Sequence, residues 1–201
     1  MRQETGSNQP VTNNKVSIQL RLDGHSFSAE ALRGALAQQE ERATICVEGY
    51  KTTLVPRETF EPHHAERYLR LCGKYPTTDE RVVFGGEEIV AVMAIPTEAQ
   101  EICESAGIAI DYTSPLLDTE HSDEECTCIY STGSVCFMRH HANGLQRAEA
   151  VCSTNEGDTL YYIIELRQEV ATSATTPLYI KSGNKQLVHT LKRYFKNVIC
   201  E

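Results

Sequence analysis

Three consecutive β-strands are predicted by residues 126–152, which read CTCIYSTGSVCFMRHHANGLQRAEAVC. Apolar and β-branched residues recur through the segments 126–130, 135–139 and 145–152. The two dipeptides between these segments, Thr132-Gly133 and Asn143-Gly144, are typical of tight hairpin turns. A meander of three antiparallel strands is therefore expected here.

The residues after this meander alternate between helix and strand. In chain order we expect a helix over about 156–171, capped by Asn155 and Asp158, and a strand at 178–181. A tight turn at 182–184, a helix that includes 187–195 and a strand at 198–200 follow. The order β-β-β-α-β-α-β implies an α/β fold with a mixed sheet and helices on its faces. It is the order of the ribonuclease-H-like unit, which occurs twice in actin-like ATPases.

The first half of the chain is interpreted as a shortened copy of this unit. Residues 16–22 alternate between apolar and polar as a half-buried strand does, and Asp23-Gly24 then turns the chain. A short second strand is expected at 25–28, followed by a helix with Ser28 at its start. Further strands are expected at 44–47, 51–55, 82–84, 89–95 and 108–110, the third and fourth forming a hairpin around Gly85-Gly86.

Local signals predict three more helices in this half. One spans about 57–72, with four residues on its inward side: Phe60, His64, Tyr68 and Leu71. In the next helix Thr97 and Gln100 form a capping box, and Gly107 follows its end. A short helix begins at Ser114-Pro115.

Changes in composition divide the chain into segments. Residues 1–14 are polar without an apolar stretch, so they are interpreted as a flexible tail and not as a secretory signal. Residues 119–125 are polar and acidic, as a linker is. We therefore expect two ribonuclease-H-like subdomains, over residues 15–121 and 122–201.

The overall charge and composition exclude several classes of protein. A formal net charge of −9 argues against a nucleic-acid partner. No apolar run approaches the roughly 20 residues that span a bilayer. The eight cysteines are dispersed over predicted strands and helices, so we expect eight free thiols and a cytoplasmic location.

Short matching stretches in this order resemble an uncharacterised family of Bacteroides-type bacteria with a duplicated actin-like fold. They are Val16–Leu20 with Asp23–Ser28, Thr53–Pro56 with Phe60, Ser114–Leu117, Tyr161-Tyr162, and Tyr194 with Asn197-Val198. The resemblance implies a fold and no reaction, because the family has no established activity. This chain looks shorter than family members between the second strand and the first helix, and it lacks a tail after the last strand.

The resemblance to actin-like ATPases locates a candidate cleft site. Such an enzyme needs a carboxylate after its first strand, phosphate-binding turns and a late Gly-Gly turn. The matching residues here are Asp23, Gly24, Ser131, Thr132, Gly133, Ser134, Ser182, Gly183 and Asn184. Ser131 occupies a carboxylate position, and the late turn keeps one glycine. We therefore expect ordinary turns, no metal-assisted hydrolysis and no cofactor.

Other chemistries have weaker support in the sequence. A ribonuclease H needs carboxylates on its central strands, and the predicted strands at 16–22 and 126–130 have none. A zinc site is suggested by a group of cysteines and histidines: Cys126, Cys128, Cys136, His140, His141 and Cys152.

The strand geometry argues against that zinc site. A two-residue loop at Thr132-Gly133 would place Ser131 opposite Ser134 and Cys128 opposite Phe137. Cys126 and Cys128 then share a face with Arg139 and His141, whereas Cys136 and His140 point to the opposite face. No metal is therefore expected. His63-His64 is interpreted as a solvated helical pair with His64 leaning on the core, and no cysteine has the surroundings of an activated thiol.

Two functions are compatible with these observations. The first is a non-enzymatic, actin-like pseudo-ATPase module that binds an unknown protein partner. The alternative is a nucleotide- or sugar-phosphate-binding enzyme of the same fold that uses the cleft between the subdomains. Fold alone does not decide between them.

Overall fold

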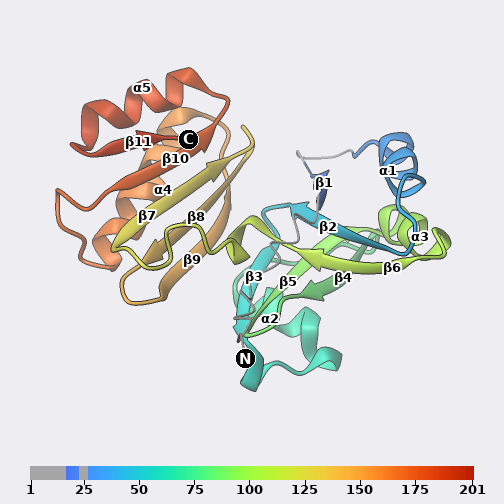
Figure 1. The fold of residues 1–201 in the computed structure, drawn as a ribbon. Helices are drawn as coiled ribbons and strands as arrows, with labels where there is room; N and C mark the ends of the chain where they lie inside the picture. Colours follow the sequence, from blue (N-terminus) through green and yellow to red (C-terminus); the bar gives the residue numbers. More distant parts are fainter. Residues whose placement is uncertain (1–16, 23–26) are drawn as a thin grey trace, which may run out of the picture.

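The computed structural model describes residues 17–22 and 27–201, which form two α/β halves (Figure 1). The elements of the C-terminal half are β7 Cys126–Ser131, β8 Val135–His141, β9 Leu145–Cys152, α4 Glu156–Glu169, β10 Leu178–Ser182, α5 Lys185–Tyr194 and β11 Val198–Cys200. Their sheet has the order β11-β10-β7-β8-β9, in which β7, β10 and β11 are parallel and β8 and β9 antiparallel. The predicted β-β-β-α-β-α-β order is confirmed.

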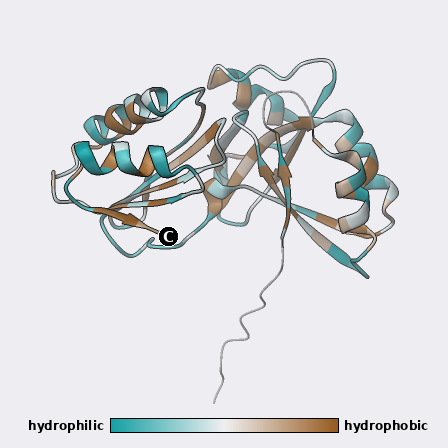
Figure 2. Ribbon diagram, turned by 90° about the horizontal axis from the view of Figure 1, so that it is seen from above, coloured by the Kyte–Doolittle hydropathy of each residue, from teal (hydrophilic) through white to brown (hydrophobic). Residues whose placement is uncertain are grey.

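The helices α4 and α5 cover one face of this sheet. Figure 2 shows hydrophobic residues on the strands and on the helix sides turned toward them. Apolar residues from both layers pack in the core between them, among them Ile129, Met138, Ile163, Leu178 and Leu187. The predicted cap of α4 is confirmed, because Asn155 Oδ1 accepts a hydrogen bond from Asp158 N. Asn184 caps α5 in the same way.

The β7–β8 hairpin has a longer turn than predicted. Ser131 lies opposite Cys136 and Cys128 opposite Arg139, so the expected pairing of Ser131 with Ser134 is wrong. Residues 132–135 close the turn, with Thr132 N donating to Val135 O. The register differs by two residues, and side chains alternate with a period of two, so each side chain keeps its predicted face.

The N-terminal half contains a parallel sheet. Its elements are β1 Ser17–Arg21, α1 Ala29–Leu36, β2 Arg42–Glu48, α3 Thr97–Ser105 and β6 Ala109–Thr113. The sheet order is β1-β2-β6, all parallel. The expected Asp23-Gly24 turn lies outside the described residues, as do two residues of the strand expected at 25–28. Its other two residues, Phe27 and Ser28, form no strand, and Ser28 Oγ accepts from Ala31 N at the start of α1.

A three-stranded antiparallel sheet lies between β2 and α3 in the chain. It consists of β3 Thr52–Pro56, β4 Glu80–Gly85 and β5 Ile89–Pro96 in the order β3-β5-β4, which confirms the predicted hairpin. Gly85 brings this sheet against β6, because a Cβ at position 85 would lie 1.8 Å from the carbonyl oxygen of Tyr112. Only glycine allows this approach.

The helix expected over 57–72 is wrong in extent and only partly right in its inward face. The chain forms two short 3₁₀ turns, η1 Arg57–Thr59 and η2 Pro62–His64, before α2 Ala65–Leu71. Pro62 lacks the N–H that a continuous helix needs, so a new turn begins there. Of the residues expected to face inward, Phe60 and Tyr68 do pack in the core, whereas His64 and Leu71 are exposed. Ala65 and Leu69 are buried instead.

The ends of the remaining helices confirm some of the local predictions and contradict one. The capping box is wrong, because Pro96 precedes α3 without a side-chain cap and Thr97 Oγ1 is buried without a hydrogen-bond partner. Gly107 has φ +70° after the end of α3, as predicted. The short helix η3 Pro115–Leu117 begins at Ser114, whose Oγ accepts from Leu116 N. No helix within the described residues is long and apolar enough to cross a membrane.

Candidate functional site

The structure brings two of the predicted turns together. Ser131 at the end of β7 is the register partner of Ser182 at the end of parallel β10. The segments 131–134 and 182–184 therefore start side by side, next to the beginning of α5. Asp23 and Gly24, the remaining predicted site residues, lie outside the described part of the chain.

Polar groups of these turns hydrogen-bond within the turns themselves. Ser131 Oγ accepts from Gly133 N at 3.4 Å, and Ser182 Oγ accepts from Asn184 N at 3.1 Å. Asn184 Oδ1 accepts from the backbone N–H groups of Gln186 and Leu187. These are the contacts of ordinary turns and helix starts, and they occupy four backbone N–H groups that could otherwise bind a phosphate.

A carboxylate that the sequence analysis did not single out lies beside the late turn. Asn184 Nδ2 donates to Glu156 Oε1 at 3.0 Å, which joins the first turn of α4 to the start of α5. This hydrogen bond lowers the pKa of Glu156, so the carboxylate stays charged at neutral pH. A negative charge at this place repels a phosphate group. The sequence showed that α4 begins with acidic residues, but not that Glu156 lies close to Asn184.

A second unforeseen carboxylate, Glu48, joins the two halves. Glu48 at the end of β2 is buried, and its Oε1 accepts from the Tyr130 hydroxyl of β7 at 2.7 Å. Its other oxygen, Oε2, accepts from Arg21 Nε at 3.0 Å, and this ion pair raises the pKa of the guanidinium. Burial and the hydrogen bond to Glu48 raise the pKa of Tyr130 to about 12. The group is a closed polar contact in which each charge has a partner.

A hollow of about 310 Å³ opens next to this contact. Glu48 and Cys46 line it from the N-terminal half, and Tyr130, Lys181 and Arg139 line it from the C-terminal half. Burial raises the pKa of the Cys46 thiol to about 12, so the thiol is protonated at neutral pH. This is the opposite of the lowered pKa that a nucleophilic cysteine requires.

The cysteines and histidines of the meander occupy the faces predicted for them. Cys126 and Cys128 lie opposite His141 and Arg139, and their Sγ atoms are 3.7 Å apart. Cys136 packs in the core on the other face of the sheet. Each of the eight cysteines is free. Burial raises the pKa of Cys128 to about 12, as it does for Cys136.

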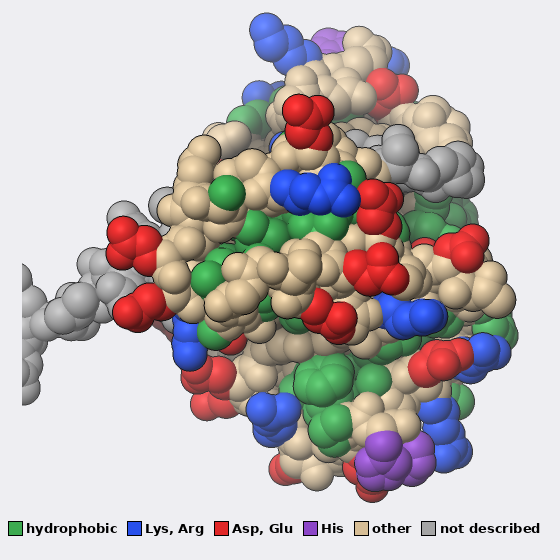
Figure 3. Space-filling model, turned by 90° about the vertical axis from the view of Figure 1, so that its right-hand side faces the viewer, with side chains coloured by type: hydrophobic (Ala, Val, Ile, Leu, Met, Phe, Trp, Pro, Cys, Tyr) green, Lys and Arg blue, Asp and Glu red, His purple; other side chains and the backbone are tan. Residues whose placement is uncertain are grey.

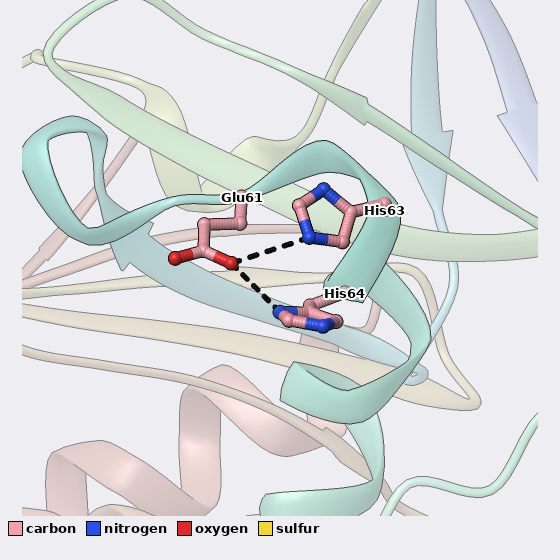
Figure 4. A group of neighbouring side chains, drawn as sticks. All are labelled: Glu61, His63 and His64. Atoms are coloured by element: carbon pink, nitrogen blue, oxygen red, sulfur yellow. Dashed lines mark ion pairs between the residues drawn. The ribbon is translucent and has the colours of Figure 1, made fainter.

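The pair His63-His64 is solvated as predicted, and it lies in the 3₁₀ helix η2 and not in an α-helix. His64 is exposed and does not lean on the core. Both rings contact one carboxylate, because Glu61 Oε2 lies 2.8 Å from His64 Nδ1 and 3.4 Å from His63 Nε2 (Figure 4). The sequence reading missed Glu61, although the spacing Glu-x-His-His was available as a signal.

Comparison with known proteins gives a family for this chain and a fold for its structure. Residues 31–198 match the sequence profile of a family described as protein of unknown function (DUF3822). A crystal structure from Bacteroides thetaiotaomicron, of a protein with an actin-like ATPase fold and unknown function, matches with a TM-score of 0.72 at 14% identity. The match covers 86% of this chain and 76% of that one, and it shows that this chain has the actin-like ATPase fold.

Two further solved structures are less similar. The cytoplasmic domain of EpsL, an inner-membrane component of the type II secretion system of Vibrio cholerae, matches at 13% identity with a TM-score of 0.37, over 78% of this chain and 68% of that one. An AlfA filament bound to AMPPNP matches at 10% identity with a TM-score of 0.45, over 85% of this chain and 57% of that one. No curated protein matches the chain.

Proposed function

We propose that this chain, which belongs to the DUF3822 family of proteins of unknown function, is a non-enzymatic actin-like module that acts by binding a protein partner. The observation that carries the proposal is Ser131 at the end of β7, where an ATPase of this fold needs a carboxylate. Its hydroxyl accepts a hydrogen bond from its own turn. A neutral hydroxyl cannot anchor a hydrated divalent cation as a carboxylate does.

The electrostatics of the late turn support the same proposal. Glu156 holds a negative charge against Asn184, in the turn that would have to accept the nucleotide. Asp158 adds a second carboxylate to the first turn of α4, where it accepts from Thr154 N. Carboxylates at a helix start use the positive end of the helix dipole that would otherwise attract phosphate.

Large hydrophobic side chains on the surface support binding to a protein. Leu71 is 72% exposed and Tyr75 60%, close together in the chain at the end of α2. Tyr161 on α4 is exposed to a similar degree but lies in the other half, so it serves as the comparison for this pair. Aromatic residues contribute much of the affinity of protein interfaces, because they bury a large area with few rotatable bonds.

The proposal is tested first with nucleotide. We expect no ATP turnover, and no rise in melting temperature with millimolar ATP and magnesium. A ligand at 100 times its Kd would stabilise the folded chain by about 2.7 kcal/mol, a rise of roughly 5–10 °C. Such a rise, abolished by a bulky charged substitution at Gly133 or Gly183, would overturn the proposal.

Partner binding is tested by cross-linking in the source cells, followed by identification of the attached protein. We expect one protein to be attached reproducibly to the wild-type chain and to be lost with the Leu71→Glu/Tyr75→Ser variant. Tyr161→Ser is the matched control on the other half. Uniform recovery of the same protein from all variants, or no reproducible product, would contradict a partner at α2.

One observation favours the alternative, a nucleotide- or sugar-phosphate-binding enzyme. Ser131 and Ser182 are adjacent, and the late turn leads directly into the first turn of α5. Helix starts attract anions. If this alternative holds, Glu156→Gln removes a repulsive charge and strengthens the binding of ATP or a sugar phosphate. Under the module proposal the variant binds no better than wild type.

A further inference from the structure

We propose that Glu61, His63 and His64 form a surface binding site for a divalent transition-metal ion of the zinc, nickel and copper class. The site is separate from the cleft turns, and it does not depend on the proposed partner binding. Figure 3 shows histidine side chains open to solvent at the lower end of the face it presents, with hydrophobic side chains next to them.

The distances between the donor atoms already fit one metal ion. Glu61 Oε2 lies 3.4 Å from His63 Nε2 and 2.8 Å from His64 Nδ1, and one donor atom of each residue lies within 4.8 Å of the others. With metal–ligand distances of about 2.0–2.2 Å, neighbouring ligands of a tetrahedral or octahedral ion are about 2.8–3.6 Å apart. The three side chains converge on one point in Figure 4. Small side-chain rotations therefore suffice to bind an ion.

The donor set selects the class of metal. Imidazole nitrogens favour Zn²⁺, Cu²⁺ and Ni²⁺, whereas Mg²⁺ and Ca²⁺ favour oxygen ligands only. All three side chains are exposed, so the remaining coordination positions face solvent. Water, or a ligand from another molecule, can occupy those positions.

The backbone that carries the ligands is held in place. Pro62 restricts the chain between Glu61 and His63, and His64 N donates to Glu61 O at 2.9 Å to close the 3₁₀ turn. The Tyr68 hydroxyl accepts from Glu61 N at 3.1 Å and donates to Thr59 O at 2.8 Å. Metal binding therefore needs to order only side chains, which lowers its entropic cost.

Two other groups of donor atoms in the described residues are less suitable. His121 is stacked on Tyr179 at 3.7 Å, and its Nε2 already lies 2.5 Å from Glu201 Oε1. The thiols of Cys126 and Cys128 lie beside the guanidinium of Arg139, whose positive charge opposes a metal ion. Both groups provide control variants.

Isothermal titration of the full chain with Ni²⁺, and separately with Zn²⁺, tests the site after removal of metal by a chelator. We expect one ion per chain. Glu61→Gln, His63→Ala and His64→Ala should each weaken binding at least about tenfold, and His63→Ala/His64→Ala should abolish it. These residues are exposed, so the melting temperature without metal should not change. Binding should be unchanged in His121→Ala and in Cys126→Ser/Cys128→Ser.

Two further measurements separate coordination from a simple ion pair. Tyr68→Phe should weaken Ni²⁺ binding by up to about tenfold without removing a ligand. The electron paramagnetic resonance spectrum of bound Cu²⁺ should show two imidazole nitrogens, and one in His63→Ala. The proposal is overturned if no saturable binding occurs, or if His121→Ala or the cysteine variant abolishes binding while His63→Ala does not.

Discussion

The two halves of the molecule share one arrangement and differ in what is inserted into it. In the C-terminal half β7, β10 and β11 are parallel neighbours, and in the N-terminal half β1, β2 and β6 are arranged in the same way. The C-terminal half inserts the hairpin strands β8 and β9 before its first helix. The N-terminal half inserts the sheet β3-β5-β4 after its second parallel strand instead. A β-α-β-α-β unit is therefore common to both, and the insertions make each half distinct.

The strand ends that meet at the junction show what this difference means for function. In the N-terminal half they end in Arg21 and Glu48, a charged pair that binds Tyr130 of the other half. In the C-terminal half they end in Ser131 and Ser182, which hydrogen-bond within their own turns. One half thus contributes a structural contact and the other a neutral turn. Among the residues that the structure describes, these strand ends provide no free carboxylate of the kind an ATPase uses.

The largest expected effect tests the inserted sheet of the N-terminal half. Gly85→Val should destabilise the chain by about 3 kcal/mol or more, because a Cβ there overlaps the backbone of Tyr112. Gly34→Ala, in a helix with open space around it, is the control and should stabilise by about 0.5–1 kcal/mol. Denaturant unfolding measures both.

Thiol labelling in the Gly85→Val variant tests whether the two halves unfold separately. Cys103 is buried in the core of the N-terminal half and Cys136 in that of the C-terminal half. If the halves unfold separately, Cys103 should be alkylated faster than in wild type and Cys136 at an unchanged rate. Equal acceleration of both thiols would mean that the two halves unfold as one unit. In denaturant without reductant, fewer than about six reactive thiols would contradict the expectation of eight free cysteines.

The contact between the halves should give a smaller effect. Tyr130→Phe removes the hydroxyl that donates to buried Glu48, so it should lower the free energy of unfolding by about 1–3 kcal/mol. Tyr161→Phe is the control, since Tyr161 is 61% exposed. A cost of zero for Tyr130→Phe would show that the two halves do not depend on this hydrogen bond.

Helix caps of the two halves should contribute about equally. Ser28 starts α1 and Asn155 starts α4, each with a side chain that accepts from the first turn. Ser28→Ala and Asn155→Ala should each cost about 1 kcal/mol. Thr97→Ala is the contrast, because Thr97 Oγ1 is buried without a partner and its removal should cost nothing or stabilise the fold. A loss of about 1 kcal/mol in Thr97→Ala would contradict this explanation.

The smallest expected effect is a dependence on pH in the C-terminal half. Burial lowers the pKa of His141, and its ring nitrogens have no hydrogen-bond partner. Neutral His141 contributes stability above the pKa of about 6.5 that a histidine has in the unfolded chain. This stability is lost as the pH falls toward the lower pKa of the folded state, because only the unfolded chain then takes up the proton. The free energy of unfolding should fall by up to about 1 kcal/mol between pH 7 and 5.5.

The variant His141→Leu isolates this histidine from the rest of the titration. Its free energy of unfolding should fall less over the same interval than that of wild type. His121 has the opposite effect on the pH dependence of stability. The hydrogen bond to Glu201 raises its pKa, so the stability that it contributes is lost as the pH rises through that raised pKa. Identical pH profiles for His141→Leu and wild type would exclude a role for His141.

Local patterns in the sequence were sufficient to predict the secondary structure and its order almost throughout the described residues, and the resemblance supplied the actin-like fold. Hydrophobic periodicity, Gly-containing turns and caps such as Asn155 are signals between residues a few positions apart, so they need no tertiary information. Cys126 and Cys128 were assigned correctly to one face although the predicted register was wrong, because side chains two positions apart in a strand always share a face. The adjacency of the turns at Ser131 and Ser182 followed from the strand order implied by the resemblance.

Contacts between groups that are far apart in the sequence could be seen only in the folded structure. Glu48 with Tyr130, and Glu156 with Asn184, are contacts across 82 and 28 positions of the chain. No local pattern encodes such distances. The start of α3 after Pro96 and the interruption at Pro62 are different, because proline's missing N–H is a local signal that the sequence analysis overlooked. The convergence of Glu61, His63 and His64 depends in the same way on where their side chains lie, which spacing along the chain does not specify.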